Sequence, residues 1–200
     1  MIRRFAPWIA VGLASLALLA VVAWRTSATH EPGSGAAAIG GDFHLVDQTG
    51  RPVDQSILKG KWTAVFFGYT YCPDVCPTTL QTLGTTVGEL GARAKDFQVV
   101  FVTVDPHRDT PPQLKAYLSS ASFPPGTIGL TGTDQEVSQA ANAYRVYFQK
   151  QGEGEAYTVD HSSAIYLMNP KGQFDSALPF GLTPDETRDR ILRAMAGQGA

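Results

Sequence analysis

The sequence is poor in cysteine and has no excess of positive charge. Its 200 residues include only 2 cysteines, and 16 basic against 18 acidic residues give a formal net charge of -2. Proteins that bind nucleic acid usually present a basic patch, so this balance predicts no nucleic-acid partner. The sequence also lacks internal repeats and a second domain boundary. Its composition, 44% hydrophobic and 17% charged, is typical of a globular chain, so we expect one folded domain and an additional segment.

An apolar stretch from Phe5 to Trp24 contains no charged residue. Two arginines precede it and Arg25 follows it. Roughly 20 helical residues cover the ~30 Å hydrocarbon core of a bilayer. Residues 1–25 are therefore predicted to be a cytoplasmic tip and a single-pass anchor in the inner membrane. The basic flank places the rest of the chain in the periplasm. A cleaved signal peptide is the alternative, but its apolar region is normally shorter.

The remainder divides into a linker and a domain. Residues 26–41 are small and polar with several glycines, which predicts a flexible linker. Residues 42–200 are predicted to form the folded domain, which is long enough to bury one core.

The elements of this domain are predicted from apolar runs and helical spacing. Unbroken apolar runs over residues 62–68 and 97–104 indicate strands buried on both faces, and a helix over 78–94 lies between them. The other predicted elements are helices over 112–120, 134–144 (with Asp134 as N-cap) and 183–196, and strands over 163–168 and 173–177. This order indicates an α/β fold: a thioredoxin-like mixed sheet flanked by helices, with inserted material between Thr127 and Asp160.

This topology predicts where the functional side chains meet. The first two strands are expected to be parallel, so the loops that follow them leave from the same edge of the sheet. If the strand over 163–168 is antiparallel to them, its beginning lies at that edge as well. Cys72, Cys76, Asp105 and His161 are therefore predicted to share one end of the sheet.

The two cysteines stand four positions apart in the run Cys72-Pro-Asp-Val-Cys76-Pro77. Because Pro77 suits a first helical turn, Cys76 is expected at or near a helix start, where the dipole favours a thiolate. A disulfide that closes so short a loop stabilises the fold little, so the pair is expected to act as a metal ligand or as a redox disulfide. Three intervening residues depart from the two of the usual thioredoxin motif.

His161 is the candidate third donor. Two thiolates and one imidazole suit Cu(I), and histidine with cysteine also suits Cu(II), while zinc would use the same donors with a fourth ligand. Asp160 is a candidate to orient the imidazole, although it can equally cap a turn.

The run from Val104 to Pro111 (VDPHRDTP) reads first as a turn rich in proline and aspartate. Its functional interpretation is that Asp105, Arg108 and Asp109 brace the site or present charge to a partner, with His107 as a candidate additional donor. Asp74, between the cysteines, belongs to the same group of bracing or partner-facing candidates.

Three runs resemble the Sco/SenC family of copper-binding proteins, which serve in cytochrome c oxidase assembly. They are Phe67-Gly-Tyr-Thr-Tyr-Cys72-Pro-Asp-Val-Cys76-Pro-Thr-Thr-Leu80, Val104-Asp-Pro-His-Arg-Asp-Thr-Pro111 and Val159-Asp-His-Ser162. The resemblance covers nearly the whole domain and the predicted anchor. The main departure is His107, where the family pattern usually has glutamate; this puts the acidity of that loop and its partner contacts in question.

The resemblance implies copper bound by Cys72, Cys76 and His161, and delivery to the dinuclear copper centre of oxidase subunit II. It also implies that the cysteine pair cycles between dithiol and disulfide, with other copper or thiol-redox proteins as further partners. A metallochaperone needs no substrate turnover, so we expect a binding protein rather than an enzyme. The enzyme alternatives are a thiol–disulfide oxidoreductase that reduces cysteines of a partner and, less favoured, a peroxidase.

Overall fold

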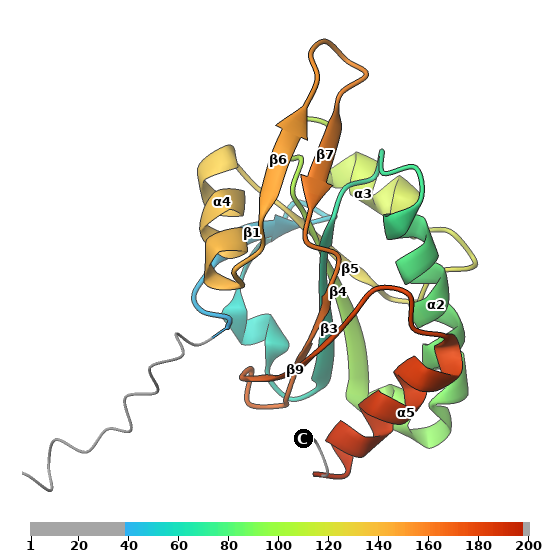
Figure 1. The fold of residues 1–200 in the computed structure, drawn as a ribbon. Helices are drawn as coiled ribbons and strands as arrows, with labels where there is room; N and C mark the ends of the chain where they lie inside the picture. The colour runs from blue at the N-terminus through green and yellow to red at the C-terminus, as the bar shows by residue number, and fades with distance from the viewer. Residues whose placement is uncertain (1–38, 198–200) are drawn as a thin grey trace, which may run out of the picture. The chain divides into compact units, whose positions relative to one another are not determined.

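The computed structural model describes residues 39–197 of the chain (Figure 1). The predicted membrane anchor and most of the predicted linker lie outside these residues. Within residues 39–197, no helix combines the length and the apolar character that crossing a bilayer requires.

The described part of the chain contains nine strands and four α-helices. The strands are β1 (His44–Asp47), β2 (Pro52–Asp54), β3 (Trp62–Gly68), β4 (Phe97–Thr103), β5 (Ile128–Thr131), β6 (Phe148–Gln151), β7 (Thr158–His161), β8 (Ile165–Met168) and β9 (Phe174–Leu178). The α-helices are α2 (Val75–Glu89), α3 (Pro111–Leu118), α4 (Asp134–Ala143) and α5 (Pro184–Met195), and two 3-10 helices are η2 (Gln55–Leu58) and η3 (Gly91–Asp96).

Seven of the strands form one mixed sheet in the order β2-β1-β5-β4-β3-β8-β9. Strands β3, β4 and β5 are parallel to one another, and β8 is antiparallel to β3. The predicted relative directions of β3, β4 and β8 are therefore confirmed. Strands β6 and β7 pair with each other in a separate hairpin, which projects beyond the edge of the sheet at the top of Figure 1.

Helices cover both faces of the sheet. On one face, Phe101 of β4 packs against Tyr117 of α3, with ring centroids 6.0 Å apart, and α2 lies beside α5 (Figure 1). On the other face, Phe67 of β3 packs against Tyr144 at the end of α4, with ring centroids 5.2 Å apart. Because β3 and β4 are central and almost wholly buried, they anchor the loops that leave their carboxyl ends.

Some predicted boundaries were wrong. Helix α2 runs from Val75 to Glu89, whereas the prediction was 78–94; Cys76 lies in its first turn, as expected. The N-cap of α4 is Thr133, whose hydroxyl accepts a hydrogen bond from the Glu136 backbone N–H in a capping box. The predicted insertion between Thr127 and Asp160 contains β5, a strand of the main sheet, and the strands β1 and β2 were not predicted.

Candidate metal centre

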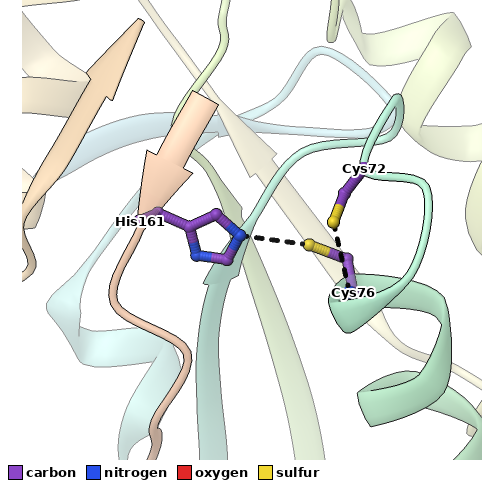
Figure 2. Close-up of side chains that lie close together, drawn as sticks. All are labelled: Cys72, Cys76 and His161. Carbon is purple, nitrogen blue, oxygen red and sulfur yellow. Dashed lines mark hydrogen bonds between the residues drawn. The ribbon is translucent and has the colours of Figure 1, made fainter. Parts of the chain in front are cut away.

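Three candidate donor atoms meet at the carboxyl end of β3. The sulfurs of Cys72 and Cys76 and a ring nitrogen of His161 all lie within 4.8 Å of one another. Figure 2 shows the imidazole pointing from the end of β7 toward the sulfur of Cys76 at the start of α2. Residues that are 85 positions apart in the sequence are thus brought together, as the predicted strand directions require.

Cys76 is the buried member of the pair. It stands in the first turn of α2, has no exposed surface, and its Sγ lies 3.4 Å from Nε2 of His161. The sulfur fits there because residue 68, the last of β3, is glycine: a Cβ at Gly68 would lie 2.7 Å from Sγ of Cys76. Gly68 therefore leaves space for the sulfur under the loop.

The more accessible Cys72 carries the more acidic thiol. A hydrogen bond from the Cys76 thiol, aided by His161 and by the backbone N–H groups of Asp74 and Cys76, lowers the pKa of Cys72 to about 3 against the effect of burial. The same hydrogen bond, together with burial and the negative charge on Cys72, raises the pKa of Cys76. The expectation that the helix start would make Cys76 the thiolate is therefore wrong.

The two ring nitrogens of His161 face different partners. Its Nδ1 lies 2.9 Å from the carbonyl oxygen of Ser162, which can only accept, so in the neutral imidazole Nδ1 carries the proton. Nε2 then carries a lone pair that can bind a metal ion, on the side of the ring that faces Cys76. The edges of two rings hold the imidazole plane, with centroids at 5.9 Å for Tyr69 and 6.3 Å for Phe66.

The loop after β4 braces the cysteine loop through Asp109. This buried carboxylate accepts hydrogen bonds from the backbone N–H of Thr70 (2.9 Å), the hydroxyl of Thr70 (2.6 Å) and the hydroxyl of Thr103 (2.7 Å). Burial raises the pKa of Asp109, and the three hydrogen bonds act against that rise. A buried acceptor with three donors fixes loop geometry, because leaving those donors unpaired costs about 1–3 kcal/mol each.

The same loop contacts the histidine hairpin through Asp105 and Arg108. Asp105 accepts a hydrogen bond from Nε of Arg108 at 2.5 Å and one from the hydroxyl of Tyr157 at 2.6 Å. Tyr157 immediately precedes β7, the strand that ends in His161. Burial and the Asp105 carboxylate raise the pKa of Tyr157 to about 12, so its hydroxyl remains a donor at neutral pH.

The other candidates lie outside this cluster. Asp74 is the N-cap residue of α2, and it accepts from the hydroxyl of Thr78 at 3.3 Å. His107 is exposed and pairs with Asp134 at 3.1 Å, and Asp160 accepts from the Gln151 side chain at 2.9 Å. None of these three belongs to the group of donor atoms found in residues 39–197.

Sequence reasoning missed three residues that shape the site: Gly68, Thr70 and Tyr157. Thr70 stands two positions before Cys72, in the run that attracted attention for its cysteines alone. Gly68 ends an apolar run, where a glycine can signal a close approach of other atoms to the backbone. Tyr157 gave no signal, because its importance depends on how the hairpin is placed.

Comparison with known proteins places these observations in a family. A family model described as SCO1/SenC matches residues 31–196. The human mitochondrial SCO2 homolog is 41% identical over 165 residues, covering 80% of this chain and 61% of that protein. Yeast mitochondrial SCO1 (Saccharomyces cerevisiae) is 44% identical over 150 residues, covering 73% and 50% respectively. The chain thus spans less than two thirds of the length of these two relatives.

Two solved structures are also similar to this chain. ScoI of Arabidopsis thaliana with copper bound is 38% identical, with a TM-score of 0.75, covering 80% of this chain and 99% of that one. ScoI of Bradyrhizobium japonicum with copper bound is 44% identical, with a TM-score of 0.71, covering 78% and 99%. Both relatives are described as holding the metal for which the three donors here are suited. On the matched model, the identities and the shared thioredoxin-like fold, this chain belongs to the SCO1/SenC family.

Proposed function

We propose that the chain is a copper chaperone. It binds one copper ion through Sγ of Cys72, Sγ of Cys76 and Nε2 of His161. It then passes this cargo to the dinuclear copper site of cytochrome c oxidase subunit II, or reduces the cysteines of that site. The observation that carries the proposal is the presence of two sulfurs and one imidazole nitrogen within 4.8 Å of one another.

The chemistry of the donors supports copper as the cargo. Thiolates are soft ligands that favour Cu(I), and imidazole suits both oxidation states of copper. Nε2 of His161 is directed at the sulfurs, while Nδ1 is engaged by the Ser162 carbonyl. Relatives solved with copper bound, at 38% and 44% identity, make the same metal the first choice here.

The exposure of the three residues supports transfer rather than storage. Cys76 is fully buried, whereas Cys72 and His161 are partly exposed. A partner's ligands would therefore reach the copper from the side of Cys72 and His161 while Cys76 still holds it.

One relative is described as having a disulfide switch and as belonging to a family of cytochrome c oxidase assembly proteins, at 25% identity.

The first experiment measures copper stoichiometry and affinity on the reduced full chain, comparing wild type with His161→Ala. We expect one copper per wild-type chain. We expect the variant to lose more than the roughly 10–100-fold in affinity that removal of a residue outside the coordination sphere typically costs. His107→Ala is the matched control, because His107 is exposed and lies outside the donor group.

Three results would contradict the proposal. If wild type and His161→Ala bind copper alike, the imidazole is not a ligand. If His107→Ala lowers the affinity as much as His161→Ala does, the effect does not come from the donor group. Wild-type chain that binds no copper would remove the chaperone function altogether.

We also propose where the chain is located in the cell. The apolar segment from Phe5 to Trp24 anchors the chain in the inner membrane, and the domain faces the periplasm. In a Gram-negative host, we expect the chain to stay with the membrane fraction after an alkaline wash, and protease added to spheroplasts to digest the domain. A chain released by the wash, or protected from the protease, would count against this location.

A second candidate function is thiol–disulfide exchange with a partner protein. The low pKa of the half-buried Cys72 favours it, since a thiolate is the attacking form. In this reaction the Cys72 sulfur attacks a disulfide of the partner, and Cys76 then resolves the mixed disulfide. The partner gains two electrons and two protons, and the chain ends with a Cys72–Cys76 disulfide. Exchange that is unaffected by His161→Ala, in a chain without copper affinity, would favour this function over the first.

A further inference from the structure

The hairpin that carries His161 is not part of the main sheet, so side-chain contacts join it to the rest of the fold. Strands β6 and β7 pair only with each other, and Figure 1 shows them projecting past the sheet edge. A two-stranded hairpin alone is marginally stable. Two hollows, of about 170 Å³ and about 620 Å³, lie where it meets the body, and both are lined by His107, Lys150 and Tyr157. The position of His161 therefore depends on the side-chain contacts that span this junction.

Arg108 makes several of those contacts from the loop after β4. Its guanidinium carbon lies 3.6 Å from the ring centroid of Tyr157. Its Nη1 donates to the carbonyl oxygens of Tyr157 at 3.0 Å and Glu155 at 3.3 Å. Asp105, to which its Nε donates, also accepts from the Tyr157 hydroxyl. The side chain thus contacts both the ring and the backbone of the residue just before β7.

Arg108 also lies against the cysteine loop. Its guanidinium carbon is 4.7 Å from the ring centroid of Tyr71, the residue before Cys72, and 5.7 Å from that of Tyr69. Tyr69 in turn meets the edge of the His161 ring. One planar cation therefore lies between the segment that supplies a thiol and the segment that supplies the imidazole, and it is 85% shielded from solvent.

We propose that Arg108 is a positioning residue for the metal site. It holds the hairpin at Tyr157 against the cysteine loop, and so sets the distance from the imidazole of His161 to the two sulfurs. Asp105 orients the guanidinium for this role. The inference rests on the copper-binding function proposed above, and it assigns Arg108 no contact with the metal.

Arg108→Lys is the sharpest variant, because lysine keeps the charge but loses the planar fork and the stacking face. On the reduced full chain we expect its copper affinity to fall about tenfold, the lower end of the range typical for residues outside the coordination sphere. Tyr157→Phe, which removes only the hydroxyl that donates to Asp105, should lower the affinity by less. Arg188→Lys is the control, because Arg188 pairs with Glu89 and Asp185, residues of the two adjacent helices α2 and α5.

A double-mutant comparison separates positioning from a general loss of stability. If Arg108 acts through the imidazole, Arg108→Lys should change copper affinity by less than about twofold once His161 is already alanine. An equal loss in both backgrounds would overturn the proposal, as would an unchanged affinity in the wild-type background. A loss of copper affinity of similar size in Arg188→Lys would also overturn the proposal.

A measurement without copper keeps this inference separate from the proposed function. Hydrogen exchange of the Thr158–His161 amides should be faster in Arg108→Lys than in wild type, while exchange of the β3 amides stays the same. If wild type binds no copper but this difference appears, the chaperone function fails and the positioning role stands. If the hairpin amides exchange at the wild-type rate, the positioning role fails whatever the copper result.

Discussion

Cys76→Ser should reduce the affinity for Cu(I) by about a thousandfold or more, which corresponds to about 4 kcal/mol. Serine replaces a soft thiolate with a hard hydroxyl that stays protonated at neutral pH, and Cu(I) strongly prefers sulfur. The exchanged atom is fully buried and lies 3.4 Å from Nε2 of His161, so no nearby solvent-exposed group can take its place easily. Competition with a chromogenic Cu(I) chelator on the reduced chain measures the change.

The control for this variant is Thr86→Ser in the same helix. Thr86 is fully buried, and serine keeps the hydroxyl that donates to the Pro184 carbonyl, so copper affinity should match that of wild type. Tight copper binding by Cys76→Ser would mean that the metal is held elsewhere, and the chaperone account would fail at its centre.

Copper affinity should fall about a hundredfold when the pH is lowered from 8 to 6. The hydrogen bond between the thiols lowers the pKa of Cys72 to about 3 and raises that of Cys76, so over this range the copper-free pair keeps one proton. Copper must displace that proton to bind both sulfurs, so each unit of lower pH costs tenfold in affinity, or about 1.4 kcal/mol.

Two readouts test this pH dependence. Chelator competition at pH 8, 7 and 6 gives the slope, and titration in weakly buffered solution gives the protons released per copper, expected to be one. An affinity that stays constant over the range would show that both thiols are already ionised before copper arrives. The assignment of the retained proton to Cys76 would then be wrong.

The fold was most predictable where apolar runs are long. Trp62–Gly68 matches its predicted strand at both ends, because a strand buried on both faces produces an unbroken apolar run. The short strand β1 was missed, since its four residues alternate irregularly and include Asp47, a buried aspartate. Hydrogen bonds to Thr49 and Arg51 satisfy that carboxylate, which no hydrophobicity pattern reveals.

The convergence of the donors was predictable from topology alone. Parallel β3 and β4 and antiparallel β8 bring the segments around Cys72 and His161 to one edge, as their order in the sequence indicated. What could not be predicted is that His161 arrives on a hairpin separate from the sheet. The contact between Arg108 and Tyr157, 49 positions apart, follows from the placement of that hairpin.

The acidity of the two cysteines could not be predicted from the helix start alone, because each thiol changes the pKa of the other. A helix start favours a thiolate, and this argument selected Cys76. In the fold, Cys76 is buried and donates to the neighbouring sulfur, so the negative charge resides on Cys72. Burial and the neighbouring thiol outweigh the helix dipole, and neither can be predicted from sequence spacing.

The most direct test of a copper site made by Cys72, Cys76 and His161 is X-ray absorption on the reduced chain loaded with one equivalent of copper. We expect two sulfur neighbours and one imidazole nitrogen around the metal, with the nitrogen signal absent in His161→Ala. A metal surrounded by nitrogen and oxygen alone, or a spectrum that His161→Ala leaves unchanged, would contradict this expectation.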